Sequence, residues 1–184
     1  MKAIRLIALA ACMAATLDAS AQEQEIRLFS HRGGRMEHDE NTLSAFQASY
    51  DAGYRGFETD IRMTRDGALV ITHDSSLERT TDGTGTVEEK TEAEIRQLAT
   101  KQGNKMMFLD ELLEFLEGKE GLYVEFEMKT KPEALYPEER LHAYCDKLYD
   151  AVMAVKPADA TFVFTSGDYR GLRYLQAKHP GVDL

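Results

Sequence analysis

The sequence predicts an α/β fold in which parallel strands alternate with helices, and three observations support this prediction. Short apolar segments of strand length alternate with longer segments whose apolar residues recur every three or four positions. Glycines and polar capping residues separate the segments, as they do between strands and helices. The 184 residues are 43% hydrophobic and 29% charged, which is the range of ordinary globular domains. We therefore expect one domain with a parallel sheet and helical crossovers.

Five strands are predicted from short segments rich in apolar and β-branched residues. They lie at residues 26–30, 56–63, 68–72, 122–128 and 161–165. Asp66 and Gly67 separate the second from the third, which is typical of a tight turn. The third strand is therefore expected to form a hairpin with the end of the second, and the other four are expected to form the parallel sheet.

Five helices are predicted from apolar periodicity and capping residues. They are a helix through residues 43–50 that Gly53 closes, a helix that a capping box at Thr91 opens and that continues to Leu98, helices at 110–116 and 137–155, and a last helix that Asp168 caps. Cys145 lies in the apolar stripe of the long helix at 137–155. This placement favours a core-filling role for the thiol over a nucleophilic one.

The charge balance excludes one class of partner. Lys and Arg number 22 against 32 Asp and Glu, which gives a net charge of -10. Nucleic acid is bound largely by neutralising phosphates with basic residues, so an acidic chain is not expected to bind DNA or RNA.

Residues 1–21 resemble a secretory signal peptide. Basic residues precede an apolar stretch at 6–13, and small residues follow it as far as Ala21. We expect cleavage after Ala21 and export to the periplasm or the exterior. Two alternatives stay open: residues 9–12 resemble a lipobox that would lipidate Cys12, or the segment forms a buried N-terminal helix. The apolar stretch is shorter than the ~20 residues of a membrane span, so no stable transmembrane segment is expected.

Polar side chains at the carboxyl ends of the predicted strands form the candidate site, because ligands of parallel α/β folds bind there. Glu58 and Asp60 share one face of their strand, and Glu127 and Lys129 share one face of theirs. Converging carboxylates repel one another unless a cation lies between them, and oxygen ligands suit Ca²⁺ or Mg²⁺. We therefore expect a divalent cation here. Taken singly, each acid could instead be an ordinary solvated or ion-paired group.

Two histidines lie at the same strand ends. His31 follows the first strand beside Arg32 and two glycines, and His73 follows the hairpin. Imidazole is suited to moving protons near neutral pH, and the cations Arg32 and Lys129 suit a phosphoryl oxygen. The combination indicates phosphodiester cleavage, although either histidine alone could serve only as a structural hydrogen-bonding group.

Seven short motifs follow one another between about residues 28 and 168. They are His31-Arg32-Gly33, Glu40-Asn41-Thr42, Glu58-x-Asp60, Thr64-x-Asp66-Gly67, His73-Asp74, Arg79-Thr80-Thr81 and Glu127-x-Lys129. Their order and approximate spacing resemble the glycerophosphodiester phosphodiesterase family. The resemblance implies a TIM-barrel hydrolase that uses a divalent cation to cut a glycerophosphodiester, a small-molecule substrate, into glycerol 3-phosphate and an alcohol.

The resemblance also implies residue roles by position. The metal ligands would be Glu58, Asp60 and Glu127, the acid/base pair His31 and His73, and the phosphate-binding cations Arg32 and Lys129. It does not say which histidine is the acid. The chain departs from the family at Glu125, where an asparagine is common; this adds a carboxylate to the ligand face.

A complete (β/α)₈ barrel typically takes about 250 residues, so residues 22–184 are expected to form a TIM-type barrel truncated after about four β/α units. Strands without lateral partners predict self-association through the open edges. Two other functions stay open. One is a related enzyme that cleaves lysophospholipids or sphingolipids, and the other is an inactive remnant that only binds a ligand.

Overall fold

The computed structural model describes residues 28–184. The predicted signal peptide, the lipobox alternative at Cys12 and the first two residues of the first predicted strand lie outside the described residues. Within the described part, no helix is long and apolar enough to cross a membrane.

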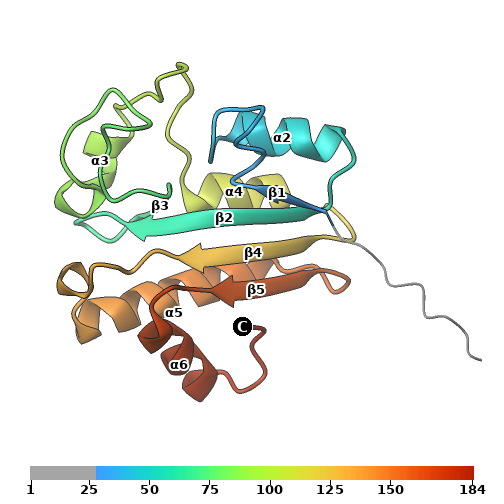
Figure 1. Cartoon of the computed structure of the whole chain (residues 1–184). Helices are drawn as coiled ribbons and strands as arrows, with labels where there is room; N and C mark the ends of the chain where they lie inside the picture. Colours follow the sequence, from blue (N-terminus) through green and yellow to red (C-terminus); the bar gives the residue numbers. More distant parts are fainter. Residues whose placement is uncertain (1–27) are drawn as a thin grey trace, which may run out of the picture.

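A parallel sheet with one antiparallel strand forms the centre of the described structure (Figure 1). Its parallel strands are, in spatial order, β1 (Phe29–His31), β2 (Gly56–Met63), β4 (Tyr123–Met128) and β5 (Thr161–Thr165). The short strand β3 (Leu69–Ile71) pairs antiparallel with the end of β2. The predicted α/β fold, with a parallel sheet and a hairpin on its second strand, is confirmed.

The helices follow the predicted order. They are α2 (Leu43–Asp51), α3 (Glu92–Ile95), α4 (Leu109–Leu116), α5 (Glu138–Val155) and α6 (Tyr169–Lys178), with short 3₁₀ helices η1 (Val87–Glu89) and η2 (Glu133–Leu135). At the start of α2, the N-cap Thr42 accepts a hydrogen bond from the Ala45 amide at 3.3 Å. The predicted continuation of α3 to Leu98 is wrong, because the chain turns away to let the Ala99 carbonyl accept from the Asp82 amide at 3.0 Å.

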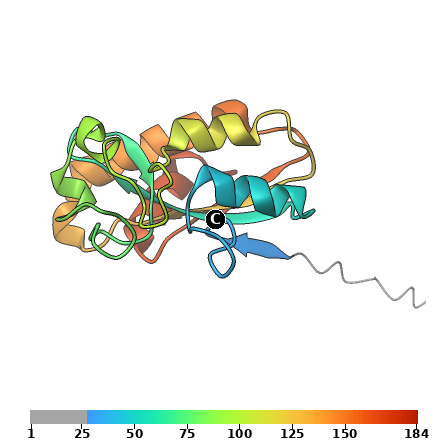
Figure 2. The ribbon, with the colours of Figure 1, turned by 90° about the horizontal axis from the view of Figure 1, so that it is seen from above.

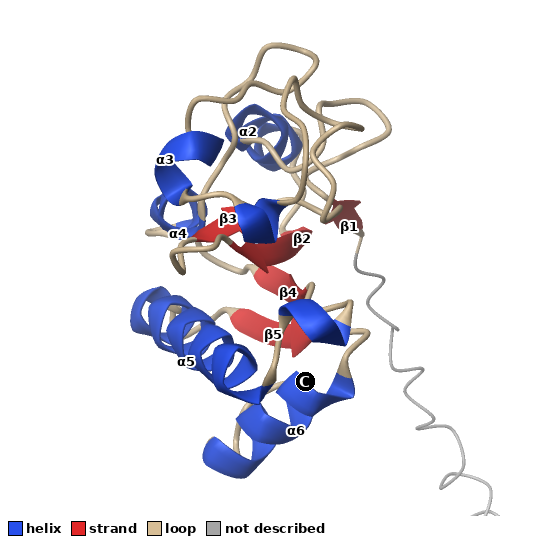
Figure 3. Cartoon of the chain, turned by 90° about the vertical axis from the view of Figure 1, so that its left-hand side faces the viewer, coloured by secondary structure: helices blue, strands red, loops and turns tan. Residues whose placement is uncertain are grey.

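The two faces of the sheet differ in polarity. Along β4, Val124, Phe126 and Met128 are buried, whereas the alternating Glu125 and Glu127 are only half-buried. The apolar face packs against the helices, and Figure 3 shows α4 and α5 together on one side of the sheet. The apolar face therefore makes the core, and the opposite face is left for polar side chains.

The described sheet is open, with β1 and β5 at the two ends of its strand order. Figure 2 shows the blue strand β1 at the rim of the molecule. The amide of Phe164 donates to the Asp183 carbonyl at 3.0 Å, so the last described residues cover part of the outer edge of β5. Cys145 is fully buried in the core, as predicted. Self-association through the edges stays a prediction.

The packing of β4 can be tested by truncating one ring. Phe126 is fully buried, with its ring centroid 5.3 Å from that of Phe162. Phe126→Ala should lower the free energy of unfolding by about 3–5 kcal/mol, because it removes a buried ring and leaves a cavity. Urea unfolding followed by circular dichroism measures the change. Met36, which is 85% exposed, gives the control: Met36→Ala should change stability by less than about 0.5 kcal/mol. Equal effects would contradict the assigned core.

Candidate active site

The register of three parallel strands brings the candidate metal ligands together. His31 of β1 is paired with Glu58 of β2, and Asp60 of β2 is paired with Glu127 of β4. One carboxylate oxygen from each of the three acids lies within 4.8 Å of the other two. The acids therefore converge at one point, as the sequence predicts.

Asp60 is the most deeply buried member of this cluster, with no exposed surface. Its Oδ2 accepts a hydrogen bond from Asn41 Nδ2 at 2.9 Å and lies 3.3 Å from Arg32 Nε. Its Oδ1 lies 3.1 Å from Lys129 Nζ, which also forms an ion pair with Glu127 at 2.6 Å. Cations from two neighbouring strands thus balance the buried charge.

The carboxylate of Glu58 has fewer polar partners than that of Asp60. Its Oε2 accepts from the Arg32 amide at 3.0 Å, but its buried Oε1 has no hydrogen-bond partner. Burial, and next the negative charge of Asp60, raises the pKa of Glu58 to about 8. An unpartnered carboxylate oxygen facing two further carboxylates fits a hard divalent cation, which would supply the missing charge. Glu58, Asp60 and Glu127 are the residues that would hold it.

His31 stands at the edge of this cluster. Its Nε2 is 3.5 Å from Glu58 Oε2, and half of the side chain is exposed. Burial, and next the positive charges of Arg32 and Arg35, hold the pKa of His31 below its usual value of 6.5. The imidazole is therefore predominantly neutral at pH 7 and can accept a proton.

His73 is held by a neighbouring carboxylate. Its Nδ1 is hydrogen-bonded to Asp74 Oδ1 at 2.6 Å, which directs Nε2 away from Asp74. Asp74 also binds Arg79 Nε through its other oxygen. Burial opposes ionisation of Asp74, but the hydrogen bonds from Arg79 and His73 outweigh it and lower its pKa to about 2.

Residues with no role predicted from the sequence also organise the site. Arg62 is buried and donates to the carbonyls of His73 at 2.9 Å and Lys129 at 3.2 Å, and its charge is balanced by Glu88 at 2.8 Å. The Arg62 side chain thus links the backbone of His73 to the backbone of Lys129. The position of Arg62 two residues after Asp60 on β2 was the available signal, since the two share a face.

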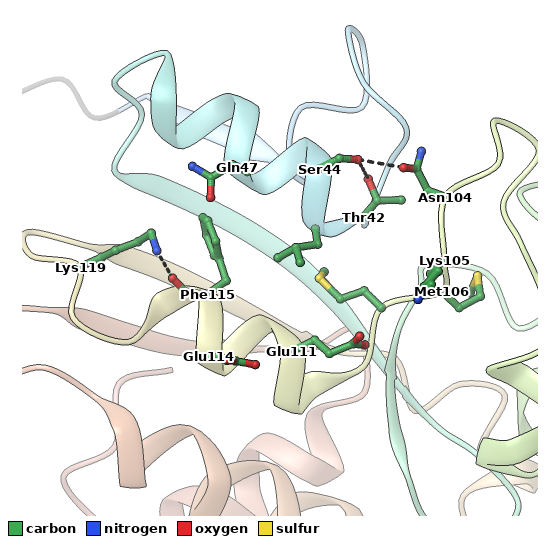
Figure 4. Close-up of a pocket in the computed structure, with 12 residues that line it drawn as sticks. Thr42, Ser44, Gln47, Asn104, Lys105, Met106, Glu111, Glu114, Phe115 and Lys119 are labelled. Atoms are coloured by element: carbon green, nitrogen blue, oxygen red, sulfur yellow. Dashed lines mark hydrogen bonds between the residues drawn. The ribbon is translucent and has the colours of Figure 1, made fainter.

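A recess beside α2 is separate from this centre. It encloses about 710 Å³ between α2 and α4, and its lining includes Gln47, Glu111 and Phe115 (Figure 4). None of the candidate ligands, histidines or cations lines it. The candidate catalytic and binding residues therefore lie at the strand ends and not in this recess.

The family model of the glycerophosphoryl diester phosphodiesterase family matches residues 31–184, which include all seven candidate residues. The chain belongs to this family. A glycerophosphodiester phosphodiesterase of Caldanaerobacter subterraneus subsp. tengcongensis is 36% identical over 123 residues, which cover 62% of this chain and 50% of that protein. Human glycerophosphodiester phosphodiesterase 1 is 44% identical over 73 residues, which cover 40% of this chain and 22% of that protein.

Solved structures of glycerophosphodiester phosphodiesterase family proteins share the fold. An Oleispira antarctica phosphodiesterase in complex with the product sn-glycerol-3-phosphate matches with a TM-score of 0.75 and 27% identity, over 85% of this chain and 63% of that chain. The Agrobacterium tumefaciens glycerophosphodiester phosphodiesterase matches with a TM-score of 0.69 and 27% identity, over 86% and 65%. The chain spans about half the length, or less, of the curated relatives it matches.

The candidate cation site can be tested by calorimetric titration with Ca²⁺ or Mg²⁺. Glu58→Gln and Glu127→Gln should each weaken the affinity roughly tenfold or more, because each variant removes a charged oxygen ligand. Glu125→Gln is the matched control, since Glu125 lies on the same face of β4 but outside the cluster. If all three variants weakened binding equally, general loss of negative charge would explain the result and the ligand assignment would fall.

The Asp74 contacts predict a dependence of stability on pH. Since its pKa is lowered from 3.8 to about 2 in the folded chain, its contribution is present above pH 3.8 and is lost as the pH falls towards 2. The difference in unfolding free energy between wild type and Asp74→Asn should therefore be constant near pH 6 and shrink between about pH 4 and pH 2. Denaturant unfolding across this range measures it, and a difference that grew on acidification would contradict the assigned contacts.

Proposed function

We propose that this chain carries the catalytic centre of a divalent-cation-dependent phosphodiesterase that hydrolyses glycerophosphodiesters to glycerol 3-phosphate and an alcohol. Membership of the family and the product complex of the Oleispira relative support the substrate class. The observation that carries the proposal is the cluster of three carboxylates, with its unpartnered Glu58 oxygen, beside a histidine and two cations.

His31 is the group that accepts a proton in this proposal. Its lowered pKa keeps the imidazole neutral at pH 7, and its position beside Glu58 places it at the cluster. It would remove the proton of the attacking hydroxyl as that oxygen forms its bond to phosphorus. Attack by water gives glycerol 3-phosphate directly, whereas attack by a hydroxyl of the glycerol part gives a cyclic phosphate, which a water molecule then opens to glycerol 3-phosphate.

His73 is the group that donates a proton. Asp74 keeps one proton of the ring on Nδ1, so Nε2 carries a proton only when the ring is doubly protonated. In that form Nε2 would pass its proton to the alkoxide as the bond from phosphorus to the leaving alcohol breaks, which leaves the neutral ring with its proton on Nδ1. The two histidines thus exchange one proton each, and their resting states are restored by solvent.

Positive charge at the site would stabilise the phosphoryl oxygens. Arg32 and Lys129 already lie against Asp60, so they are held in place before a substrate arrives. A divalent cation bound by the carboxylates would supply further positive charge for the developing phosphorane. The side chains of this chain would orient the substrate.

Substitution of the histidines separates proton transfer from cation binding. His31→Ala and His73→Ala should each lower the turnover of a soluble glycerophosphodiester, such as glycerophosphocholine, by about 10²–10⁴-fold, the usual effect of losing an acid/base group. Both variants should bind Ca²⁺ or Mg²⁺ as wild type does in calorimetry.

His142 provides the control, because its ring stacks on Tyr174 of α6. His142→Ala should keep full turnover. Full activity in either His31→Ala or His73→Ala would overturn the role given to that histidine, and an inactive wild type would overturn the proposed function for this chain.

A further inference from the structure

Glu40 joins the two halves of the candidate centre. It lies in the loop that follows β1, and its side chain is largely buried, with 15% of its surface exposed. Its Oε1 accepts from Arg32 Nη1 at 3.1 Å on one side and from Arg79 Nη2 at 2.7 Å on the other. One carboxylate therefore binds the candidate phosphate-binding arginine and a second arginine from a distant loop.

The contact with Arg79 has a fixed geometry. Both terminal nitrogens of Arg79 bind Glu40, one to each oxygen, because the second bond runs from Nη1 to Oε2 at 3.0 Å. The remaining nitrogen, Nε, binds Asp74. A planar guanidinium that is held in this bidentate way has little freedom to rotate. The position of Glu40 therefore determines where the Nε atom of Arg79 lies for its contact with Asp74.

The chain of contacts ends at a candidate catalytic ring. Asp74 binds His73 Nδ1 at 2.6 Å, so the sequence of contacts runs from Arg32 through Glu40, Arg79 and Asp74 to His73. The charges alternate along it. The hydrogen bonds from Arg79 lower the pKa of Glu40, which keeps its carboxylate ionised at neutral pH. Isolated exposed ion pairs contribute little, but a bidentate pair within a network is an exception to this rule.

We propose that Glu40 is a positioning residue that acts through Arg79 and Asp74 to hold the His73 ring in one tautomer, with Nδ1 towards Asp74 and Nε2 facing the substrate. This inference rests on the proposed function only in giving the Nε2 atom of His73 a role towards the substrate. The contacts that carry it concern the tautomer and orientation of the ring, which can be measured without substrate.

The first readout is the nitrogen NMR spectrum of histidine-labelled chain at one alkaline pH, at which imidazole rings are neutral and the tautomer can be read. The signals lost in His73→Ala identify the His73 nitrogens. In wild type, their chemical shifts should be well separated, as expected for a single neutral tautomer. In Glu40→Gln the shifts should move towards each other, because Arg79 is no longer held and both tautomers become populated. Arg79→Met should have the same effect, and the double variant should add nothing further, since both changes interrupt one path.

Asp39 provides the matched control. It precedes Glu40 in the same loop and accepts from Asn104 Nδ2 at 2.9 Å, so it ties that loop to another segment without touching Arg79. Asp39→Asn should therefore leave the His73 signals unchanged. If it moved them as much as Glu40→Gln does, a general role in loop structure would replace the positioning role.

Kinetics with glycerophosphocholine and Ca²⁺ or Mg²⁺ provides the second readout. Glu40→Gln should lower kcat by about tenfold, within the range found for outer-shell partners, and Asp39→Asn should stay within about twofold of wild type. Unchanged nitrogen signals in Glu40→Gln would overturn the positioning role even if kcat fell. Absence of turnover in every chain, wild type included, would overturn the proposed function, and the nitrogen signals would still decide the role of Glu40.

Discussion

A fully buried carboxylate in the central strand is the constraint on which the rest of the site depends. Asp60 has no exposed surface, and an uncompensated charge in such a place would be strongly destabilising. Its compensation comes from both neighbouring strands: Arg32 and Asn41 follow β1, and Lys129 follows β4. Because these partners must all reach one side chain, the ends of three strands are fixed relative to one another. Glu58, two residues earlier on β2, is thereby held in a position where one of its oxygens has no protein partner.

Much of the fold could be predicted because its signals are local. The bounds of β2 and β5 coincide with the predicted segments at 56–63 and 161–165. β5 is a short apolar run, and β2 alternates apolar or β-branched residues with polar ones, and both are local strand patterns. The wrong prediction for the end of α3 arises from contacts that are not local. Its capping box forms as predicted at Thr91, but the residues after Ile95 pair with the distant loop that contains Asp82. Contacts between segments far apart in sequence overrule local helix propensity, and a local pattern does not contain them.

In the candidate site, too, some contacts could be predicted from the sequence and others could not. The convergence of Glu58, Asp60 and Glu127 could be predicted because side chains two apart on a strand share a face, and parallel strands end at one edge of the sheet. The contact between Glu40 and Arg79 could not, because 39 residues separate them and both lie in loops. Each stands in a short motif of the family, but a motif records the residue types and does not say which loops meet. Only the three-dimensional path of the chain supplies that information.

Backbone strain at the start of the site shows how closely these contacts depend on one another. Arg32 and Asn41 adopt positive φ angles of 54° and 58°, a conformation that costs a residue with a side chain about 1–3 kcal/mol. The strain persists because other contacts determine the geometry: the Arg32 amide donates to both the carbonyl and the carboxylate of Glu58, and the Asn41 amide donates to the Arg32 carbonyl at 2.8 Å. This same backbone turn aims the Arg32 and Asn41 side chains at Asp60. The free energy stored in two unfavourable torsions is therefore offset by the buried carboxylates that they serve, so neither the turn nor the carboxylates would be stable in this form without the other.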